Sequence, residues 1–138
     1  MTGVQTCALP ISSVLTTAEK EQLVKFAVTT CADKVPVVLN IAEGSTKEAL
    51  QQAEYAKAWG AKGLMMLPPM RYKSDHRETV TYFKTVANAT ELPIMIYNNP
   101  VDYKVDVTIP MLEQLMKEHA NIEAIKDSTR DEIGKAHV

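Results

Sequence analysis

Four short apolar runs recur along this chain at a nearly constant spacing, and this spacing constrains the fold more than any other feature. The runs begin at about residues 35, 63, 93 and 122, a period of about 29 residues. Each is largely apolar, as expected of a strand covered on both faces. A strand and a helix repeated at constant period predict right-handed crossovers and a parallel sheet. The predicted strands are VPVVL (35–39), GLMML (63–67), LPIMIY (92–97) and IEAI (122–125).

Helix-start signals lie before and between these strands. A Ser, Thr or Asp followed three residues later by Glu has the spacing of a capping box, in which both side chains accept hydrogen bonds from backbone N–H groups. A threonine with a proline marks a further start, and a glycine marks a helix end. We expect a helix at about 17–31 and one helix after each of the first three strands. The signals are Thr16-x-x-Glu19, Ser45-x-x-Glu48, Asp75-x-x-Glu78, Thr108 with Pro110, and Gly60.

These elements favour an α/β fold that is a partial (β/α)8 TIM barrel, with about four consecutive βα units preceded by one helix. Eight units at this period would total about 240 residues, close to the ~250 residues typical of a complete barrel. An open, doubly wound sheet is the alternative. We favour half a barrel because no strand is followed by a glycine-rich phosphate turn such as GxGxxG or a Walker loop.

Composition and charge indicate one globular domain and argue against several classes of partner. The 138 residues are 46% hydrophobic and 23% charged, and the formal net charge is −2. Because the lysines are scattered and form no basic block, neither nucleic acid nor an anionic membrane is an expected partner. No apolar stretch approaches the ~20 residues that cross a bilayer. Two cysteines without CxxC spacing favour a reducing cytoplasm. A small anionic metabolite remains as a partner.

Both ends of the chain resemble translated sequencing adapters. Residues 1–12, MTGVQTCALPIS, are similar to the read-through translation of a widely used adapter, and residues 132–138, EIGKAHV, are similar to the opposite adapter strand with one substitution. We expect 1–12 and 132–138 to be adapter-like artefacts and 13–131 to be the partial TIM-barrel domain. Arguments about fold and function accordingly exclude the two ends.

The carboxyl ends of parallel strands are where ligands gather in α/β folds, so residues there are candidates for chemistry. Tyr97 ends the third predicted strand, and Lys126 follows the fourth. A lysine whose charged form is desolvated has a lowered pKa, and its neutral amine can attack a ketone to form an iminium. A tyrosine one strand away can relay a proton. The structural alternatives are a solvated lysine at a strand end and a half-buried core tyrosine.

Longer motifs resemble one enzyme family. The segments GAKGLMMLPP, LPIMIYNNP and NIEAIKDST, with the helix start STKEAL, look like the dihydrodipicolinate synthase and N-acetylneuraminate lyase family of class I, Schiff-base aldolases. The resemblance covers the chain from about Ser13 to Asp131. It implies that Lys126 is the Schiff-base lysine and Tyr97 the catalytic tyrosine of a Y-N-x-P motif. It further implies a 2-oxo acid substrate, no cofactor and a parent protein that forms homotetramers.

The chain departs from the family pattern at three places. The family's Gly-Thr-Thr-Gly-Glu carboxylate-binding turn should directly precede Ser12, where adapter-like sequence stands. Val101-Asp102-Tyr103 stands where true dihydrodipicolinate synthases carry an arginine, which argues against aspartate semialdehyde as the second substrate. Arg71 replaces the second tyrosine of the family's P-Y-Y turn. It could bind a substrate carboxylate bidentately, or it could be a solvated loop residue.

The functional hypothesis is a fragment of a Schiff-base-forming lyase, divergent from true dihydrodipicolinate synthase. It would act as an aldolase, dehydratase or deaminase on a 2-oxo acid or cyclic imino acid. The alternative is a non-catalytic α/β binding or scaffold module. No metal site is expected, because His76 and His119 have no ligand-spaced partner. For the 138-residue chain itself we expect little or no turnover, because half a barrel leaves its outer strands with unpaired edges.

Overall fold

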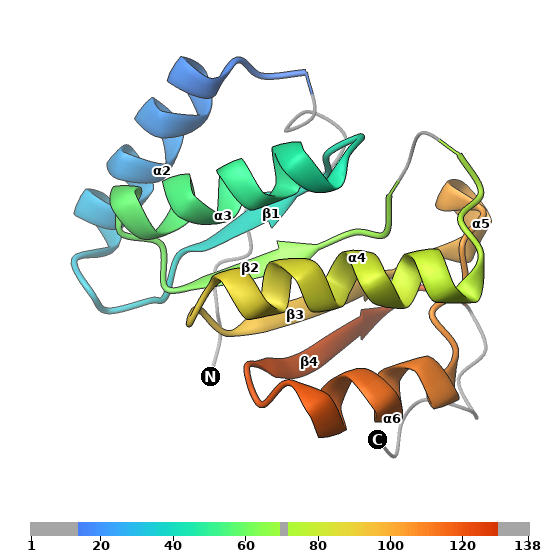
Figure 1. Cartoon of the computed structure of the whole chain (residues 1–138). Coiled ribbons are helices and arrows are strands. Elements are labelled where there is room, and N and C mark those ends of the chain that lie inside the picture. Colours follow the sequence, from blue (N-terminus) through green and yellow to red (C-terminus); the bar gives the residue numbers. More distant parts are fainter. Residues whose placement is uncertain (1–13, 70–71, 130–138) are drawn as a thin grey trace.

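The computed structural model describes residues 14–69 and 72–129, and strands and helices alternate along them (Figure 1). The helix expected at 17–31 is confirmed, whereas the single-turn helix α5 was not anticipated. The strands are β1 (Val38–Ile41), β2 (Gly63–Met66), β3 (Ile94–Asn98) and β4 (Ile122–Asp127). The helices are α2 (Thr17–Cys31), α3 (Thr46–Trp59), α4 (His76–Ala89), α5 (Pro100–Tyr103) and α6 (Ile109–Glu118).

The four strands form one parallel sheet in chain order, β1-β2-β3-β4. Consecutive order, with a helix in each connection, is the arrangement of successive units in a (β/α)8 barrel. A doubly wound sheet would instead reverse its strand order at a switch point. The described structure is therefore a partial (β/α)8 barrel, as predicted. Strands β1 and β4 are its two outer strands.

All four strands differ from the sequence prediction at one end or at both: β2 ends at 66 rather than 67, and β3 spans Ile94–Asn98 rather than 92–97. We expected the first strand at 35–39, but β1 spans Val38–Ile41. Pro36 has no N–H group for a strand ladder, and the hydrogen bond from Lys62 N–H to the Val37 carbonyl, 2.8 Å long, precedes the paired residues. We expected the fourth strand to end at 125, but β4 runs to Asp127 because Lys126 and Asp127 pair with Tyr97 and Asn98 of β3.

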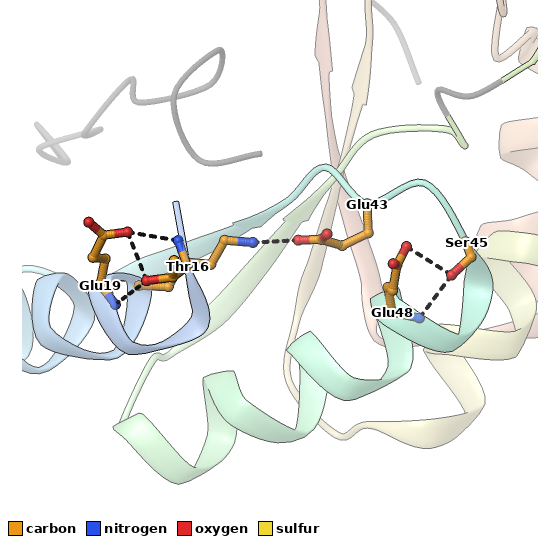
Figure 2. Close-up of polar contacts among 6 residues, drawn as sticks. Thr16, Glu19, Glu43, Ser45 and Glu48 are labelled. Atoms are coloured by element: carbon orange, nitrogen blue, oxygen red, sulfur yellow. Dashed lines mark hydrogen bonds and ion pairs between the residues drawn. The ribbon is translucent and has the colours of Figure 1, made fainter. Parts of the chain in front are cut away.

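Side-chain caps mark the starts of α2, α3, α4 and α5, whereas α6 begins after Thr108 without a side-chain cap hydrogen bond and has a proline in its first turn. Thr16 and Glu19 form the predicted capping box at the start of α2: Thr16 Oγ1 accepts from the Glu19 N–H at 3.3 Å, and Glu19 Oε2 accepts from the Thr16 N–H at 2.8 Å (Figure 2). Asp75 and Glu78 form the same box at α4. The backbone and hydroxyl hydrogen bonds from Thr16 lower the pKa of the Glu19 carboxyl, because they favour its charged form.

A buried ion pair ties the first turn of α2 to the loop after β1. Lys20 keeps only 7% of its side chain exposed, and its Nζ lies 2.6 Å from Glu43 Oε1. Shortly after Glu43, Ser45 caps α3 by accepting from the Glu48 N–H at 3.2 Å (Figure 2). The start of α2 is thereby fixed against the segment that joins β1 to α3.

The predicted end of α3 at Gly60 is confirmed. Gly60 adopts a φ of 89°, a left-handed conformation that glycine reaches without strain, and its N–H bonds the Ala56 carbonyl. A Cβ at this position would lie 3.4 Å from the Val28 side chain of α2. That distance is an ordinary van der Waals contact, so the left-handed backbone conformation, and not lack of space, is what favours glycine here.

The main core lies between the helices and one face of the sheet. Alternate strand residues point into it, and Ile41, Met66 and Ile96 have no exposed surface. From the helices, Phe83 and Leu115 are equally buried. We call this side of the sheet the helix face and the opposite side the inner face.

Candidate active site

Tyr97 and Lys126 lie side by side at the carboxyl end of the sheet. Strands β3 and β4 pair in parallel, with Tyr97 opposite Lys126 and Asn98 opposite Asp127. The Nζ atom of Lys126 lies 4.4 Å from the centre of the Tyr97 ring. The structure thus brings together the two residues that the sequence singled out for chemistry.

A β-bulge decides which face of the sheet Lys126 occupies. The register between β3 and β4 shifts so that Glu123 is an extra residue in β4. Without this shift Ile122 and Lys126, four residues apart, would share the helix face. With it, Ile122 and Ile125 both pack in the main core, and Lys126 lies on the inner face beside Tyr97. The one polar residue that interrupts the predicted strand is therefore what places the amine.

The inner face carries a small apolar cluster around Tyr97. Tyr97 itself is 7% exposed, whereas Lys126 is half-buried. The ring of Tyr103 meets that of Tyr97 edge-on, with centroids 6.2 Å apart and an interplanar angle of 78°. The Lys126 amine and the Tyr97 phenol therefore lie next to a cluster of apolar side chains. The buried members are Ala42, Met65, Leu67 and Tyr97, and Met95 and Tyr103 pack against them.

Asn98 joins the end of β3 to two other segments. It has no exposed surface, and its Nδ2 donates to Asp127 Oδ1 at 2.8 Å and to Asp106 Oδ1 at 3.0 Å. Its Oδ1 accepts from the Val107 N–H at 2.8 Å. Both amide hydrogens and the amide oxygen are therefore engaged. Because Asp127 follows Lys126 directly, this network holds the lysine in register with β3.

Asn99 contacts the Tyr97 phenol directly. Its Nδ2 donates to the Tyr97 hydroxyl oxygen at 3.1 Å and to Asp102 Oδ2 at 2.6 Å, and its Oδ1 accepts from the Asp102 N–H at 3.3 Å. Ser128 Oγ donates to the same phenol oxygen at 3.5 Å. Burial raises the pKa of the neighbouring Tyr103 phenol, and the charges of Tyr97 and Asp102 add to the rise.

Asn98 is the asparagine of the Y-N-x-P motif, but sequence reasoning assigned no role to Asn98, Asn99 or Asp106. For Asn99 a signal existed, since an asparagine followed by proline is typical of a helix N-cap, and Asn99 is the N-cap of α5. The roles of Asn98 and Asp106 depend on contacts between segments that no local pattern reports. Asp127 and Ser128, which follow Lys126 directly, form hydrogen bonds with Asn98 and with the Tyr97 hydroxyl.

Some expected features lie outside the described residues. Arg71, the expected carboxylate ligand, is one of them, as are the adapter-like segments 1–12 and 132–138. Within residues 14–69 and 72–129, no group of three or more His, Cys, Asp or Glu side chains is placed to hold a metal ion. In the same ranges, no helix is both long enough and apolar enough to cross a bilayer.

Known proteins share both sequence and fold with this chain. The model of the dihydrodipicolinate synthetase family matches residues 10–136. The 4-hydroxy-tetrahydrodipicolinate synthase of Gluconacetobacter diazotrophicus is 36% identical over 118 residues, which are 86% of this chain and 39% of that protein.

Solved structures agree. The dihydrodipicolinate synthase of Aquifex aeolicus superposes with a TM-score of 0.81 at 34% identity, over 85% of this chain and 40% of that one. The chloride-inhibited dihydrodipicolinate synthase of Acinetobacter baumannii, complexed with pyruvate, superposes with a TM-score of 0.83 at 30% identity. The match covers 88% of this chain and 41% of that one. The chain spans about two-fifths of the length of these relatives. It belongs to the dihydrodipicolinate synthetase family.

Proposed function

We propose that this chain is part of a Schiff-base-forming lyase that acts on a 2-oxo acid or a cyclic imino acid, with Lys126 as the nucleophile and Tyr97 as the proton carrier. The observation that supports it is the pairing of these residues on adjacent strands, with Nζ 4.4 Å from the ring centre. The carboxyl ends of the strands are where barrel enzymes hold their catalytic groups. The similar protein from Acinetobacter baumannii was solved with pyruvate, a 2-oxo acid.

The proposed reaction begins at the carbonyl carbon of the substrate. The neutral amine of Lys126 attacks this carbon, and a proton passes from the nitrogen to the former carbonyl oxygen, relayed by Tyr97, to give a carbinolamine. Tyr97 then gives a proton to the departing hydroxyl, which leaves as water, and the C=N bond of the iminium forms. The iminium accepts the electron pair of an adjacent C–C or C–H bond and becomes an enamine. A C–C bond breaks in this step, whereas after loss of the C–H proton the enamine can expel a protonated hydroxyl or amino group from the neighbouring carbon. Water finally hydrolyses the iminium and restores the amine.

Residues other than Lys126 and Tyr97 restrict the class of substrate that we propose. The segment Val101-Asp102-Tyr103 in α5 lacks the arginine that true dihydrodipicolinate synthases carry here. The proposed enzyme is therefore divergent and does not use aspartate semialdehyde. Arg71 is proposed to bind the substrate carboxylate, because a guanidinium can bind both carboxylate oxygens at once. An aldolase, a dehydratase and a deaminase share the same iminium and differ in the bond that breaks next.

Borohydride trapping tests the proposal. The full-length gene product that carries this chain is incubated with pyruvate, reduced with borohydride and digested, and the adduct is mapped by mass spectrometry. We expect the reduced pyruvate imine on Lys126, and none in the Lys126→Arg variant. An adduct on another lysine, or none in the unsubstituted protein, would contradict the proposal and favour a non-catalytic binding or scaffold module.

The proposal concerns a longer parent protein, because the relatives are more than twice as long as the matched segment. We propose that the parent is cytoplasmic and forms homotetramers. In the described part of the 138-residue chain, no strand pairs with the outer edges of β1 and β4, and Val38 on β1 is 45% exposed. Open edges favour self-association, so we expect this chain to associate and to turn over little substrate. A monodisperse, active monomer in size-exclusion and rate measurements would contradict this expectation.

A further inference from the structure

We propose that Asn99 and Asp102 form a positioning pair that fixes the direction of the Tyr97 proton, so that the phenol offers its hydrogen to the substrate on Lys126. The inference rests on the function proposed above and goes beyond the Lys126–Tyr97 pair. It starts from a buried hydrogen bond to the phenol, from Asn99 Nδ2 to the Tyr97 oxygen at 3.1 Å. Asn99 itself is 7% exposed.

The orientation of the Asn99 amide follows from its other partner. Asp102 bonds it twice: the Asp102 backbone N–H, which can only donate, points at Asn99 Oδ1 at 3.3 Å, and the Asp102 carboxylate, which accepts, takes the Nδ2 hydrogen at 2.6 Å. Turning the amide over would set a donor against the backbone N–H and an acceptor against the carboxylate. Asn99 is therefore held with its NH2 group toward Tyr97.

This orientation decides what the phenol can do. A tyrosine hydroxyl has one hydrogen to donate and lone pairs with which to accept. Because Asn99 donates, the Tyr97 oxygen accepts, and Ser128 Oγ donates to the same oxygen at the longer distance of 3.5 Å. The hydroxyl hydrogen is then directed away from both side chains and is kept for the substrate. The same two donors stabilise the oxygen while its proton is away on the substrate.

The pair also assigns a role to Asp102, which lies in a segment where the chain departs from its family. Asp102 lies in α5, whose N-cap is Asn99, so the four-residue helix brings the carboxylate back over the amide that precedes it. A cation at this position could not accept the Nδ2 hydrogen. The departure at Asp102 therefore belongs to the proton path and is not an isolated surface change.

The test reverses the polarity of one hydrogen bond while leaving its shape unchanged. In the full-length gene product, Asn99→Asp places an acceptor against the Tyr97 oxygen, which draws the phenol hydrogen to the protein. The double variant Asn99→Asp/Asp102→Asn keeps the charge of the pair and its mutual hydrogen bonds but has the same reversed polarity toward Tyr97. Iminium formation from pyruvate is followed by rapid mixing and borohydride quenching, alongside the KM for pyruvate.

General acid–base catalysis contributes about 10²- to 10⁴-fold to a rate. Misdirecting the proton should remove part of it, and we expect iminium formation to slow by about 10- to 100-fold in both variants while the KM for pyruvate changes by less than about twofold. Val101→Ala, at a site in the same helix that is 49% exposed, is the matched control and should keep the unsubstituted rate.

The outcomes separate this inference from the function it rests on. Absence of an adduct on Lys126 in the unsubstituted protein overturns the proposed function, and the inference with it. A normal adduct in the unsubstituted protein, with the double variant at the same rate, overturns the inference alone. Because the double variant conserves the charge of the pair, it remains the deciding comparison even if Asn99→Asp by itself does not fold. A slow double variant with unchanged KM supports the positioning pair.

Discussion

The two faces of strand β3 differ in what their side chains do. On the helix face, Ile94 and Ile96 are 1% and 0% exposed and sit in the main core. On the inner face, Met95 is half-buried and Tyr97 engages in hydrogen bonds and lies under the Lys126 amine. Adjacent residues of one strand thus line the main core on one face and the proposed active site on the other. Substitutions on the two faces should therefore give separable losses, one in unfolding free energy and one in rate.

The largest expected effect is on the inner face. Lys126→Ala should abolish the borohydride-trapped adduct and lower turnover on the order of 10³-fold or more, because covalent catalysis loses its nucleophile. Because Lys126 is only half-buried, the unfolding free energy should change by less than about 1 kcal/mol. Trapping and urea titration on the same preparation check both statements. Turnover within tenfold of the unsubstituted protein would contradict the assignment of Lys126.

Alanine substitutions at the neighbouring residues Ile96 and Met95 test whether the helix face of β3 contributes more to stability than the inner face. Ile96→Ala should cost about 2–5 kcal/mol of unfolding free energy, since it removes a fully buried side chain and leaves a cavity in the main core. Met95→Ala removes a half-buried chain on the inner face, where the surroundings can relax, and should cost about 1 kcal/mol. Urea titration measures both. Equal costs would show that the inner face is packed as tightly as the helix face.

The difference between the faces also marks how far sequence reasoning could go. The period of the strands, the capping boxes and Gly60 are local patterns, and each predicted its element correctly. The face of Lys126 was not predictable by alternation, because counting back to Ile122 would have put it in the main core. Only the shift at Glu123, which depends on pairing with β3, moves it. Hydrophobic periodicity reports burial within a segment and not the register between segments.

The hydrogen bonds of the polar residues at the site were even less predictable from the sequence than the face of Lys126. Asn98 ends a strand, where its sequence neighbours suggest nothing more than a turn, yet its amide joins three segments. Its partners Asp106 and Asp127 come from separate parts of the chain. Networks of this kind are assembled by the tertiary fold, so a single sequence contains no local signal for them. The pair of Tyr97 and Lys126, in contrast, was predictable because parallel strand ends meet at one edge.

Breaking the Asn98 network should affect both faces, with a smaller loss than at Ile96. Asn98→Ala removes the donor to two carboxylates and leaves the buried Val107 N–H without its acceptor, which should cost about 1–3 kcal/mol. Since the Asp127 side chain then loses its hydrogen bond to Asn98, and only backbone pairing holds this end of β4 to β3, iminium formation at Lys126 should slow as well. Urea titration and the trapping rate are measured together. Lost stability with an unchanged trapping rate would show that Lys126 is positioned by the strand alone.

The smallest change in unfolding free energy is expected when two buried tyrosines, one on each side of the sheet, are replaced by phenylalanine. Tyr82 is 2% exposed in the main core, and its hydroxyl forms no hydrogen bond with the described residues. Tyr82→Phe should therefore change the unfolding free energy near pH 7 by no more than about 1 kcal/mol, with stabilisation the expected sign, because an unsatisfied buried hydroxyl is removed. Tyr97→Phe should instead leave stability nearly unchanged and slow iminium formation. A clear loss of stability in Tyr82→Phe at neutral pH would mean that this hydroxyl has a partner.

The pH dependence sharpens that comparison. Burial raises the pKa of Tyr82 above its ordinary value of 10.0, and the charge of Glu43 adds to the rise. The folded protein therefore holds this proton at a pH where the unfolded chain has released it. The stability linked to Tyr82 is fully present below about pH 10 and falls as the pH rises further. Tyr82→Phe cannot lose it, so the margin by which the variant is the more stable protein should stay constant from about pH 7 to about pH 9 and grow above about pH 10, measured by urea titration. A margin that stays constant above about pH 10 as well would mean that water reaches Tyr82, and that the helix face is less closed than its burial indicates.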